Sequence, residues 1–260
     1  MQELGSPLLR PVLLYLLVLA RVGGLVTFAP FWGHKSTAKQ VRVMLALALA
    51  LVLTPVVAPR LPPPPADAIS LLLLLASELL IGCAFGFVGR MVLSGLEIAA
   101  HIFTFQMGYS LVSTIDPATQ SQVTALSVLA QMLVLLLLLA GDGHHWFLLA
   151  TANSYQHVAP GHFVFTPTLA QLLLRLSADA LAVGVALAAP AIVALLAVEL
   201  ALAIAGQVVP QLQVFVLSFP LKIIVGLWLV GGALFFLPGA VRTTLSALRE
   251  ALTHTLAAMT

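Results

Sequence analysis

Long apolar runs separated by short polar breaks dominate the pattern of the chain. A membrane-spanning helix needs about 20 mostly apolar residues, whereas a strand would show apolar and polar residues in strict alternation, which no segment does. We therefore expect an all-α membrane protein, a single membrane-embedded domain over residues 1–260 without a soluble module. The expected spans are 11–32, 41–58, 69–89, 91–112, 123–140 with a continuation through 152, 178–205 and 212–237. A shorter leucine-rich segment, 169–176, is expected to be interfacial or re-entrant.

Two breaks between these runs indicate the orientation of the chain. The stretch 34–42, HKSTAKQVR, is the densest basic cluster, and basic loops are enriched on the cytoplasmic side. The stretch 59–67, PRLPPPPAD, cannot be helical because proline removes backbone donors. Alternation from a cytoplasmic 34–42 puts the N-terminus, the proline-rich stretch and 113–122 outside, and the tail with Arg242 and Arg249 inside.

Composition agrees with a membrane protein and removes other classes. Apolar residues make up 61% of the chain and charged residues 8%, whereas a soluble protein has about 25% charged residues. The formal charge of +2 forms no basic patch with aromatic residues, so we expect no nucleic-acid partner. The single cysteine, Cys83, excludes an intrachain disulfide and is expected to be buried and inert. The first apolar run lacks a cleavage site, so we expect a retained helix there.

Several helices are rich in small residues, which let helices approach each other closely in lipid. The stretches are GCAFGFVG (82–89), AVGVALAAPA (182–191), ELALAIAG (199–206) and VGGA (230–233). Glu78 and Glu199 are isolated acids in such runs. We expect these faces to meet protein neighbours, with the two acids forming hydrogen bonds at subunit contacts rather than catalysing a reaction.

A polar stripe follows one face of the expected helices around position 97. Arg90, Ser94, Glu97, His101 and Thr104 are spaced by four, three, four and three residues, which places them on one side of a helix. Charged groups at membrane depth normally face a partner or water. The stripe predicts either a buried structural network, in which the 97/101 pair satisfies itself, or a proton relay or conduction path.

The stretch GDGHHW (141–146) contains three residue types that bind metals. Adjacent histidines on a helix point about 100° apart, and the chain has no HExxH spacing. Two glycines and Asp142 instead indicate a turn between helices. We therefore expect no metal site, and no catalytic motif or cofactor-binding fingerprint is present in the sequence.

Two further stretches break the apolar pattern. In FQMGYSLVSTIDPATQSQ (105–122), Gly108 and the Asp116–Pro117 pair oppose a continuous helix, which predicts an external loop or a re-entrant segment. In VVPQLQVFVLSFPLK (208–222), two prolines and two glutamines predict a bent hairpin whose polar groups are held by protein. Lys222 could extend its amine to a membrane interface. Such a hairpin suits a subunit of an assembly.

Four stretches in order resemble the FliR family of flagellar biosynthetic proteins, which includes the T subunits of injectisomes. They are RVGGLVTFAPFWG (21–33), FQMGYSLVSTIDP (105–117), GDGHHWFLLATANSYQHVAP (141–160) and ELALAIAGQVVPQLQVFVLSFPLK (199–222). Each is weak by itself, and the four together are specific. The 115–122 and GHHW stretches are closer to the flagellar branch. The chain departs from the family at Ala38, Gln207 and Gln213, where members often carry proline, arginine and asparagine.

The resemblance implies a non-enzymatic structural subunit of the type III export gate, without a cofactor, in the bacterial inner membrane and the flagellar basal body. The implied partners are FliP-like, FliQ-like and FlhB-like subunits, unfolded flagellar export substrates and membrane lipid. Residues 1–190 would be FliP-like, 191–237 a FliQ-like hairpin and 238–260 a C-terminal tail. The implied pore plug comprises Phe105, Gln106, Met107, Gly108, Tyr109, Ser110, Asp116 and Pro117. The implied assembly or polar network comprises Arg90, Glu97, His101, Glu199, Pro210, Gln211, Gln213, Phe215, Pro220 and Lys222.

Two rival functions come from the residues alone. A secondary transporter or ion channel would use the Arg90, Glu97 and His101 stripe as its ion path, but it predicts internal repeats with matched broken helices, and none is convincing. An intramembrane hydrolase or metalloenzyme would use the segment 142–145, where the ligand spacing counts against it.

Overall fold

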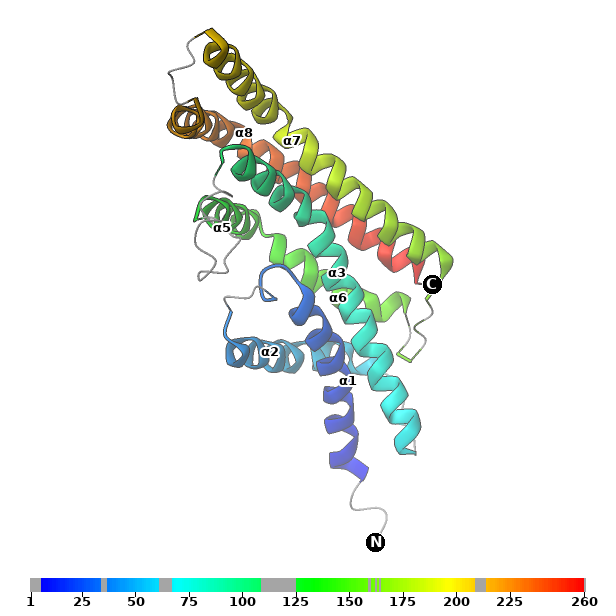
Figure 1. The fold of residues 1–260 in the computed structure, drawn as a ribbon. Helices are drawn as coiled ribbons and strands as arrows, with labels where there is room; N and C mark the ends of the chain where they lie inside the picture. The colour runs from blue at the N-terminus through cyan, green and yellow to red at the C-terminus, as the bar shows by residue number, and fades with distance from the viewer. Residues whose placement is uncertain are drawn as a thin grey trace. The chain divides into compact units, whose positions relative to one another are not determined.

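The structure is a computed structural model that describes residues 6–33, 37–60, 67–108, 125–158, 160–161, 163, 165–208 and 214–259. Within these ranges the chain is helical and contains no strand (Figure 1). The elements are α1 (Ser6–Phe28), α2 (Lys39–Val57), the short 3-10 helix η1 (Ala58–Arg60), α3 (Ala68–Gln106), α5 (Ala125–Ala140), α6 (Gly143–His157), α7 (Pro167–Val208) and α8 (Val214–Ala258). The expected all-α fold is confirmed.

Several helices have the length and composition of membrane spans. Among the described residues, four helices qualify: Arg10–Phe28, Lys39–Val57, Ala68–Gln106 and Pro167–Val208. The number rises to six if two bent pairs each count as one span, namely Val128–Ala140 with Gly143–His157 and Leu217–Ala233 with Pro238–Ala258. These helices agree with a multi-pass membrane protein.

One expected helix boundary is wrong. The runs 69–89 and 91–112, expected as two spans, are joined at Arg90 in the single helix α3, which runs from Ala68 to Gln106. Arginine is a good helix former, and the Arg90 side chain is exposed, so its charge does not interrupt the backbone. The inside–outside alternation assumed a break at Arg90. The sides assigned to segments after that residue therefore lose their basis.

Two other segments belong to longer helices than expected. The segment 169–176, expected as a separate interfacial or re-entrant helix, is the beginning of α7. The segment 238–260, expected as a tail, is helical to Ala258 as the last part of α8. Ser177 does not break α7, because its hydroxyl donates a hydrogen bond to the carbonyl of Leu173 within the same helix (2.8 Å).

The described helices group into two compact units built from segments far apart in the sequence. Unit 1 comprises Met1–Val92, Asp142–Ser177 and Leu245–Thr260, and unit 2 comprises Leu93–Gly141 and Ala178–Thr244. Helices α3, α7 and α8 each contribute residues to both units. Neighbours in space therefore cannot be inferred from neighbours along the chain.

In unit 1, α1 packs on α2 through a stripe of apolar residues. Leu14, Val18, Val22 and Val26 repeat every four residues and are almost fully buried against Ala46, Ala50 and Val57. This spacing places the stripe on one helix face. A second cluster joins α3, α6, the first turns of α7 and the last turns of α8. Its buried residues include Phe85, Phe147, Leu169 and Leu248.

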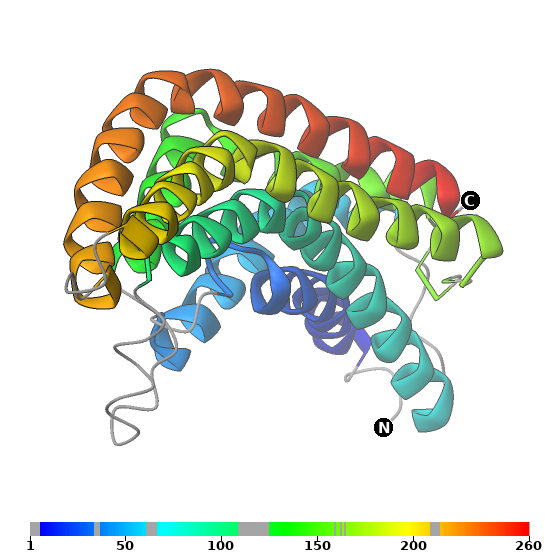
Figure 2. The ribbon, with the colours of Figure 1, turned by 45° about the horizontal axis from the view of Figure 1, so that its top comes forward.

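The last turns of α8 lie beside the first turns of α7, which both views show (Figures 1 and 2). The Thr166 hydroxyl donates a hydrogen bond to the Ala258 carbonyl (2.6 Å) and accepts one from the Leu169 backbone N–H (3.1 Å). A side-chain oxygen at this position caps the beginning of α7. The Thr166 hydroxyl therefore caps the start of α7 and also fixes the end of α8.

In unit 2, α3 and α7 cross at glycines. A β-carbon at Gly184 would lie 2.6 Å from Cγ2 of Ile98 and 3.0 Å from the Gly95 carbonyl oxygen. The two backbones therefore approach too closely for any side chain at position 184. The stretch 182–191 was expected to meet a protein neighbour, and at this position the neighbour is a helix of the same chain.

Candidate functional site

An ion pair that is completely removed from solvent joins α1 to α3. Arg21 and Glu78 are both 0% exposed. Nε and Nη2 of Arg21 donate hydrogen bonds to Oε2 and Oε1 of Glu78, at 2.8 and 2.9 Å. This is the two-pronged geometry that suits a guanidinium and a carboxylate best. Two hydrogen bonds in a fixed plane determine both the distance and the orientation of the two helices here.

Glycines bring the two helices close enough for this pair. A β-carbon at Gly24 would lie 2.8 Å from the backbone nitrogen of Cys83, and one at Gly82 would overlap the Arg21 carbonyl oxygen. Gly24 is three residues after Arg21, and Gly82 is four residues after Glu78. One helical turn from each glycine, the charged side chains therefore face each other.

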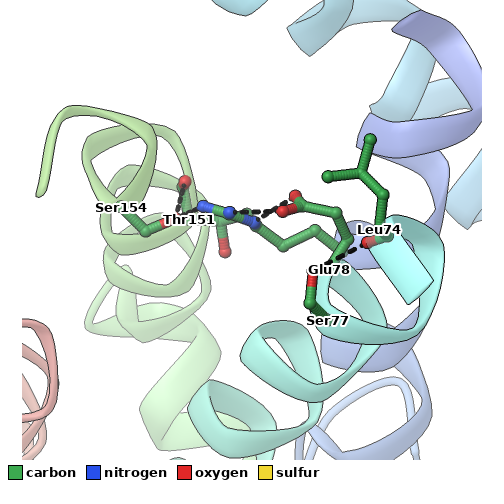
Figure 3. Close-up of polar contacts among 6 residues, drawn as sticks. Leu74, Ser77, Glu78, Thr151 and Ser154 are labelled. Carbon is green, nitrogen blue, oxygen red and sulfur yellow. Dashed lines mark hydrogen bonds and ion pairs between the residues drawn. The ribbon is translucent and has the colours of Figure 1, made fainter. Parts of the chain in front are cut away.

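Helix α6 supplies the remaining partners of the Arg21 guanidinium. Nη1 of Arg21 donates to the Ser154 hydroxyl (2.6 Å), which donates to the Thr151 carbonyl (2.6 Å). Figure 3 shows Glu78 on one helix facing Ser154 and Thr151 on another, with dashed lines along this chain of contacts. Three helices from separate parts of the sequence thus meet at one guanidinium. We call Arg21, Glu78, Ser154 and Tyr155 the Arg21 network.

The aromatic ring of Tyr155 covers the same guanidinium. The Cζ of Arg21 lies 3.8 Å from the ring centroid, a distance at which a cation is attracted to the π-face. Tyr155 is 4% exposed. Its hydroxyl is one of two buried side-chain polar atoms without a hydrogen-bond partner in the described part of the chain. The ring therefore contributes to the network, and the hydroxyl does not.

The chemistry of the Arg21 network suits structure better than catalysis. An arginine stays protonated in proteins, so it cannot relay a proton. Its charge is paired with Glu78, a further N–H group donates to Ser154, and its face is covered by the Tyr155 ring. No nucleophile with an adjacent general base is part of the group. The network holds α1, α3 and α6 together.

The predicted polar stripe lies on α3, and its charged residues form no ion pair in the described part of the chain. Among the described ion pairs, none joins Arg90, Glu97 or His101. Arg90 and His101 are exposed and Glu97 is half-buried. The expected pair of Glu97 with His101 is not formed among these residues. Thr104 is buried and donates to its own helix carbonyls.

The predicted hairpin contains an ion pair that the sequence interpretation missed. Nζ of Lys222 lies 2.8 Å from Oε1 of Glu199, with the two side chains 13% and 55% exposed. Lys222 therefore pairs with Glu199 of α7, a partner that the sequence interpretation did not foresee. Pro220 is exposed within α8. Pro210, Gln211 and Gln213 lie outside the described residues, as does the side chain of Phe215.

The predicted plug is described only at its beginning. Phe105 is exposed, Gln106 is half-buried and ends α3, and Met107 is completely buried. Gly108 adopts a left-handed backbone conformation (φ 86°). The other predicted plug residues lie outside the described part of the chain: Tyr109, Ser110, Asp116 and Pro117.

The expected turn at 141–143 is confirmed, since α5 ends at Ala140 and α6 begins at Gly143, with Asp142 at φ 59°. The argument that the two histidines diverge is wrong. Their ring centroids are 4.2 Å apart, and one ligand atom each from Asp142, His144 and His145 lies within 4.8 Å of the others. These three residues could hold a metal ion, although Asp142 and His145 are mostly exposed and His145 Nδ1 already contacts the Asp142 carboxylate (3.2 Å).

Sequence reasoning missed the Arg21 network. The sequence interpretation assigns no partner to Arg21 and expects Glu78 at a contact with another subunit. The available signal was a cation and an anion, each inside a different apolar span. Charged side chains in such positions commonly pair with one another in membrane proteins. Ser154 and Tyr155 gave no comparable signal, because hydroxyl residues are common in helices of any kind.

The fold and the site together define a class: an all-helical, multi-pass membrane protein whose buried charges are used to hold helices together. Residues 12–248 match the sequence model of the family described as bacterial export proteins, family 1. The chain is 34% identical to the flagellar biosynthetic protein FliR of Caulobacter vibrioides over 214 residues, which are 82% of this chain and 85% of that protein. It is 32% identical to FliR of Escherichia coli K12, over 84% of this chain and 82% of the relative. The chain therefore belongs to the FliR family.

A relative from a second secretion system also matches. The chain is 28% identical to the Yop proteins translocation protein T of Yersinia pestis over 216 residues, which are 82% of each protein. The expected membership of the FliR family is confirmed, and this match agrees with a family that includes the T proteins of injectisomes.

Proposed function

We propose that this chain is a structural subunit of the flagellar type III export apparatus and helps to form and close the channel for unfolded export substrates. The family match over residues 12–248 carries the proposal, supported by the relatives named as flagellar biosynthetic and translocation proteins. The Arg21 network supports a structural role, because its charged groups are paired with each other and the Ser154 hydroxyl donates to a backbone carbonyl rather than to a general base.

The proposed partners are FliP-like, FliQ-like and FlhB-like subunits in the bacterial inner membrane, at the flagellar basal body. Large apolar side chains on α8 support close neighbours of some kind: Trp228, Phe235 and Phe236 are 80%, 84% and 72% exposed. Such a surface is stable only in lipid or against another protein. The Arg90, Glu97 and His101 stripe would pair with a neighbouring subunit, since it forms no ion pair within the described chain.

Deletion and complementation test the proposed function. A strain lacking this chain should neither swim nor secrete flagellar export substrates, and the gene supplied in trans should restore both. Affinity purification of the restored chain should recover FliP-like and FliQ-like subunits. Normal secretion in the deletion strain would refute the function. If a variant without the charges of the stripe secretes and co-purifies as wild type does, only the role of that stripe is refuted.

The plug proposal rests on the family resemblance of residues 105–117. Removal of residues 110–114 should leave the complex assembled, because the flanking helices carry their own contacts, and should raise ion permeability of the inner membrane. Dye or ion flux would be compared with wild type at equal complex abundance. Unchanged flux in a fully assembled complex would place the seal in another subunit.

A further inference from the structure

The end of α3 rests on a part of α8 that has no side chain. Met107, the first residue after α3, is 0% exposed, and Gly226 of α8 is also buried. A β-carbon at position 226 would lie 2.5, 2.6 and 2.7 Å from Cε, Cγ and Sδ of Met107. Carbon atoms in van der Waals contact are about 3.5–4.0 Å apart. Met107 therefore occupies the volume that any side chain at 226 would need.

A second contact lies two helical turns away on the same side of α8. A β-carbon at Gly108 would lie 3.1 and 3.2 Å from Cδ1 and Cε1 of the Phe219 ring. Phe219 and Gly226 are seven residues apart, a spacing that returns to the same helix face. Two successive residues at the end of α3 thus contact one face of α8.

The backbone at this point is also fixed. The Gly108 N–H donates to the Phe105 carbonyl (3.0 Å), and Gly108 has the left-handed conformation that commonly ends a helix. On the face of α8 between Phe219 and Gly226, Lys222 pairs with Glu199 of α7 (2.8 Å). The end of α3 is therefore held in conformation by Gly108 and in place by a helix that is itself tied to α7.

We propose that Gly226 is a positioning residue of the export gate, because its missing side chain admits Met107 and so fixes the end of α3 against α8. The inference rests on the proposed function, since α3 ends where the stretch resembling the family's pore loop begins. We call the contact of Met107 with Gly226 the Met107 seat. Methionine suits this seat because its unbranched thioether fills irregular gaps. A methyl group at 226 would force Met107 out of a buried position and would displace the end of α3.

Gly226→Ala tests this role, with Gly239→Ala as the matched control. Both glycines lie in α8, and both substitutions raise helix propensity equally. A β-carbon at 226 overlaps Met107, whereas a β-carbon at 239 has nothing within 4 Å. With partner subunits co-expressed and complex abundance equalised, Gly226→Ala should raise ion flux across the membrane several-fold and lower secretion. Gly239→Ala should match wild type.

The double variant Met107→Ala/Gly226→Ala separates the contact from a general effect on α8. If the two residues act through one contact, the double variant should leak no more than Met107→Ala alone. The same comparison applies to complex abundance if Gly226→Ala assembles poorly, and removal of the Met107 side chain should then restore assembly. Additive defects, or no rescue of assembly, would overturn the proposal.

A disulfide tests the seat without reference to secretion. In a Cys83→Ala background, which removes the single native cysteine, Met107→Cys/Gly226→Cys brings two β-carbons close together, since the 226 position lies 2.6 Å from Met107 Cγ. Disulfides form at β-carbon separations of about 3.5–4.5 Å. Oxidation of the assembled complex should protect both thiols from a maleimide–polyethylene glycol reagent. The control pair Met107→Cys/Gly239→Cys should stay reactive.

The outcomes distinguish the two proposals. If the deletion strain secretes normally, the proposed function fails, and the positioning role fails with it. If deletion abolishes secretion and the disulfide forms, but Gly226→Ala leaks and secretes as wild type, only the positioning role fails. If the 107/226 thiols stay reactive after oxidation, the seat itself is refuted.

Discussion

At the scale of single residues, the Arg21 network shows how a membrane helix tolerates an arginine. Removing a charge from water is costly, and the cost is recovered only when a partner and all hydrogen bonds are in place. Here Glu78 forms an ion pair with Arg21, Ser154 accepts a further hydrogen bond from it, and the Tyr155 ring covers the face of the guanidinium. The arrangement makes the residue dependent on all three neighbours.

Removal of one charge should therefore be much worse than removal of both. Arg21→Ala leaves Glu78 buried without a partner and should cost about 3–5 kcal/mol of stability. Arg21→Met/Glu78→Leu replaces the pair with apolar side chains of similar size and should recover most of that loss. Thermal unfolding of the detergent-solubilised complex would measure both. Equal damage from the single and double variants would mean that the charge pair is not the origin of the effect.

Tyr155 permits a separation of ring and hydroxyl. Tyr155→Phe removes a buried hydroxyl that has no partner in the described structure, so stability should stay within about 1 kcal/mol of wild type or rise. Tyr155→Leu removes the ring above Arg21 and should cost about 0.5–2 kcal/mol more. Unfolding temperatures of the two variants in the same complex provide the comparison. Equal losses of more than about 1 kcal/mol in both variants would show that the hydroxyl, which both lack, has a partner in the assembly and that the ring contributes little.

Asp67 makes the first turn of α3 sensitive to pH. Its carboxylate accepts hydrogen bonds from the Ser70 hydroxyl and, at 2.9 Å, the Ser70 backbone N–H, and these lower the pKa of Asp67 below its ordinary value of 3.8. A lowered pKa means that the cap stabilises the helix above that value and that the support is lost as pH falls through the folded pKa. Hydrogen exchange across residues 67–72 should show this loss in acid. Asp67→Asn should keep the cap but lose the pH dependence, and Asp67→Ala should lose both.

At the scale of elements, helix length exceeds what a simple span requires. With 39 residues, α3 is about 58 Å long, nearly twice the roughly 30 Å of a hydrocarbon core. Helices of this length must extend beyond a bilayer or tilt strongly. Glycine crossings at Gly82 and Gly184 bind α3 to α1 in unit 1 and to α7 in unit 2.

The apolar pattern predicted the positions of these helices well and their ends less well. The glycine cluster at 141–143 predicted a real break, and the α-helix before the proline-rich stretch 59–67 ends at Val57, although Pro59 and Arg60 continue as the 3-10 helix η1. The break expected at Arg90 does not exist, since a polar side chain changes the surroundings a helix needs without opposing the helix. Partners such as Arg21 and Glu78 could not be assigned, because the pairing depends on a crossing of two helices that are distant in the sequence.

The second interhelical ion pair should matter far less than the first. Glu199 pairs with Lys222, but its side chain is 55% exposed, so water can replace the partner. Glu199→Gln should cost no more than about 1 kcal/mol, whereas the same change at the completely buried Glu78 should cost about 3–5 kcal/mol. Thermal unfolding of the two complexes side by side tests the contrast. Equal losses would indicate that another subunit buries Glu199.

At the scale of the whole molecule, the apolar exterior makes the chain dependent on its surroundings. Expressed alone, it should aggregate or be degraded in detergent, because α8 exposes Trp228, Phe235 and Phe236 and a β-carbon at Gly231 or Gly232 would have nothing within 4 Å. Co-expression with FliP-like and FliQ-like subunits should raise the yield of monodisperse material, as measured by size-exclusion chromatography. A stable monomer that is active in liposomes would contradict the role of a gate subunit.

The core of unit 1 also determines when the protein can mature during translation. The core of unit 1 buries Leu248, Leu252 and Leu256 beside Phe85 and Phe147. One side of this core therefore stays uncovered until the ribosome has released residues 245–260. Residues of α1 and α3 must therefore wait for residues 245–260, with apolar surface open to membrane chaperones and proteases meanwhile. A nonsense codon near position 245 would leave α1 to α7 in the product, yet the product should be cleared like a misfolded protein.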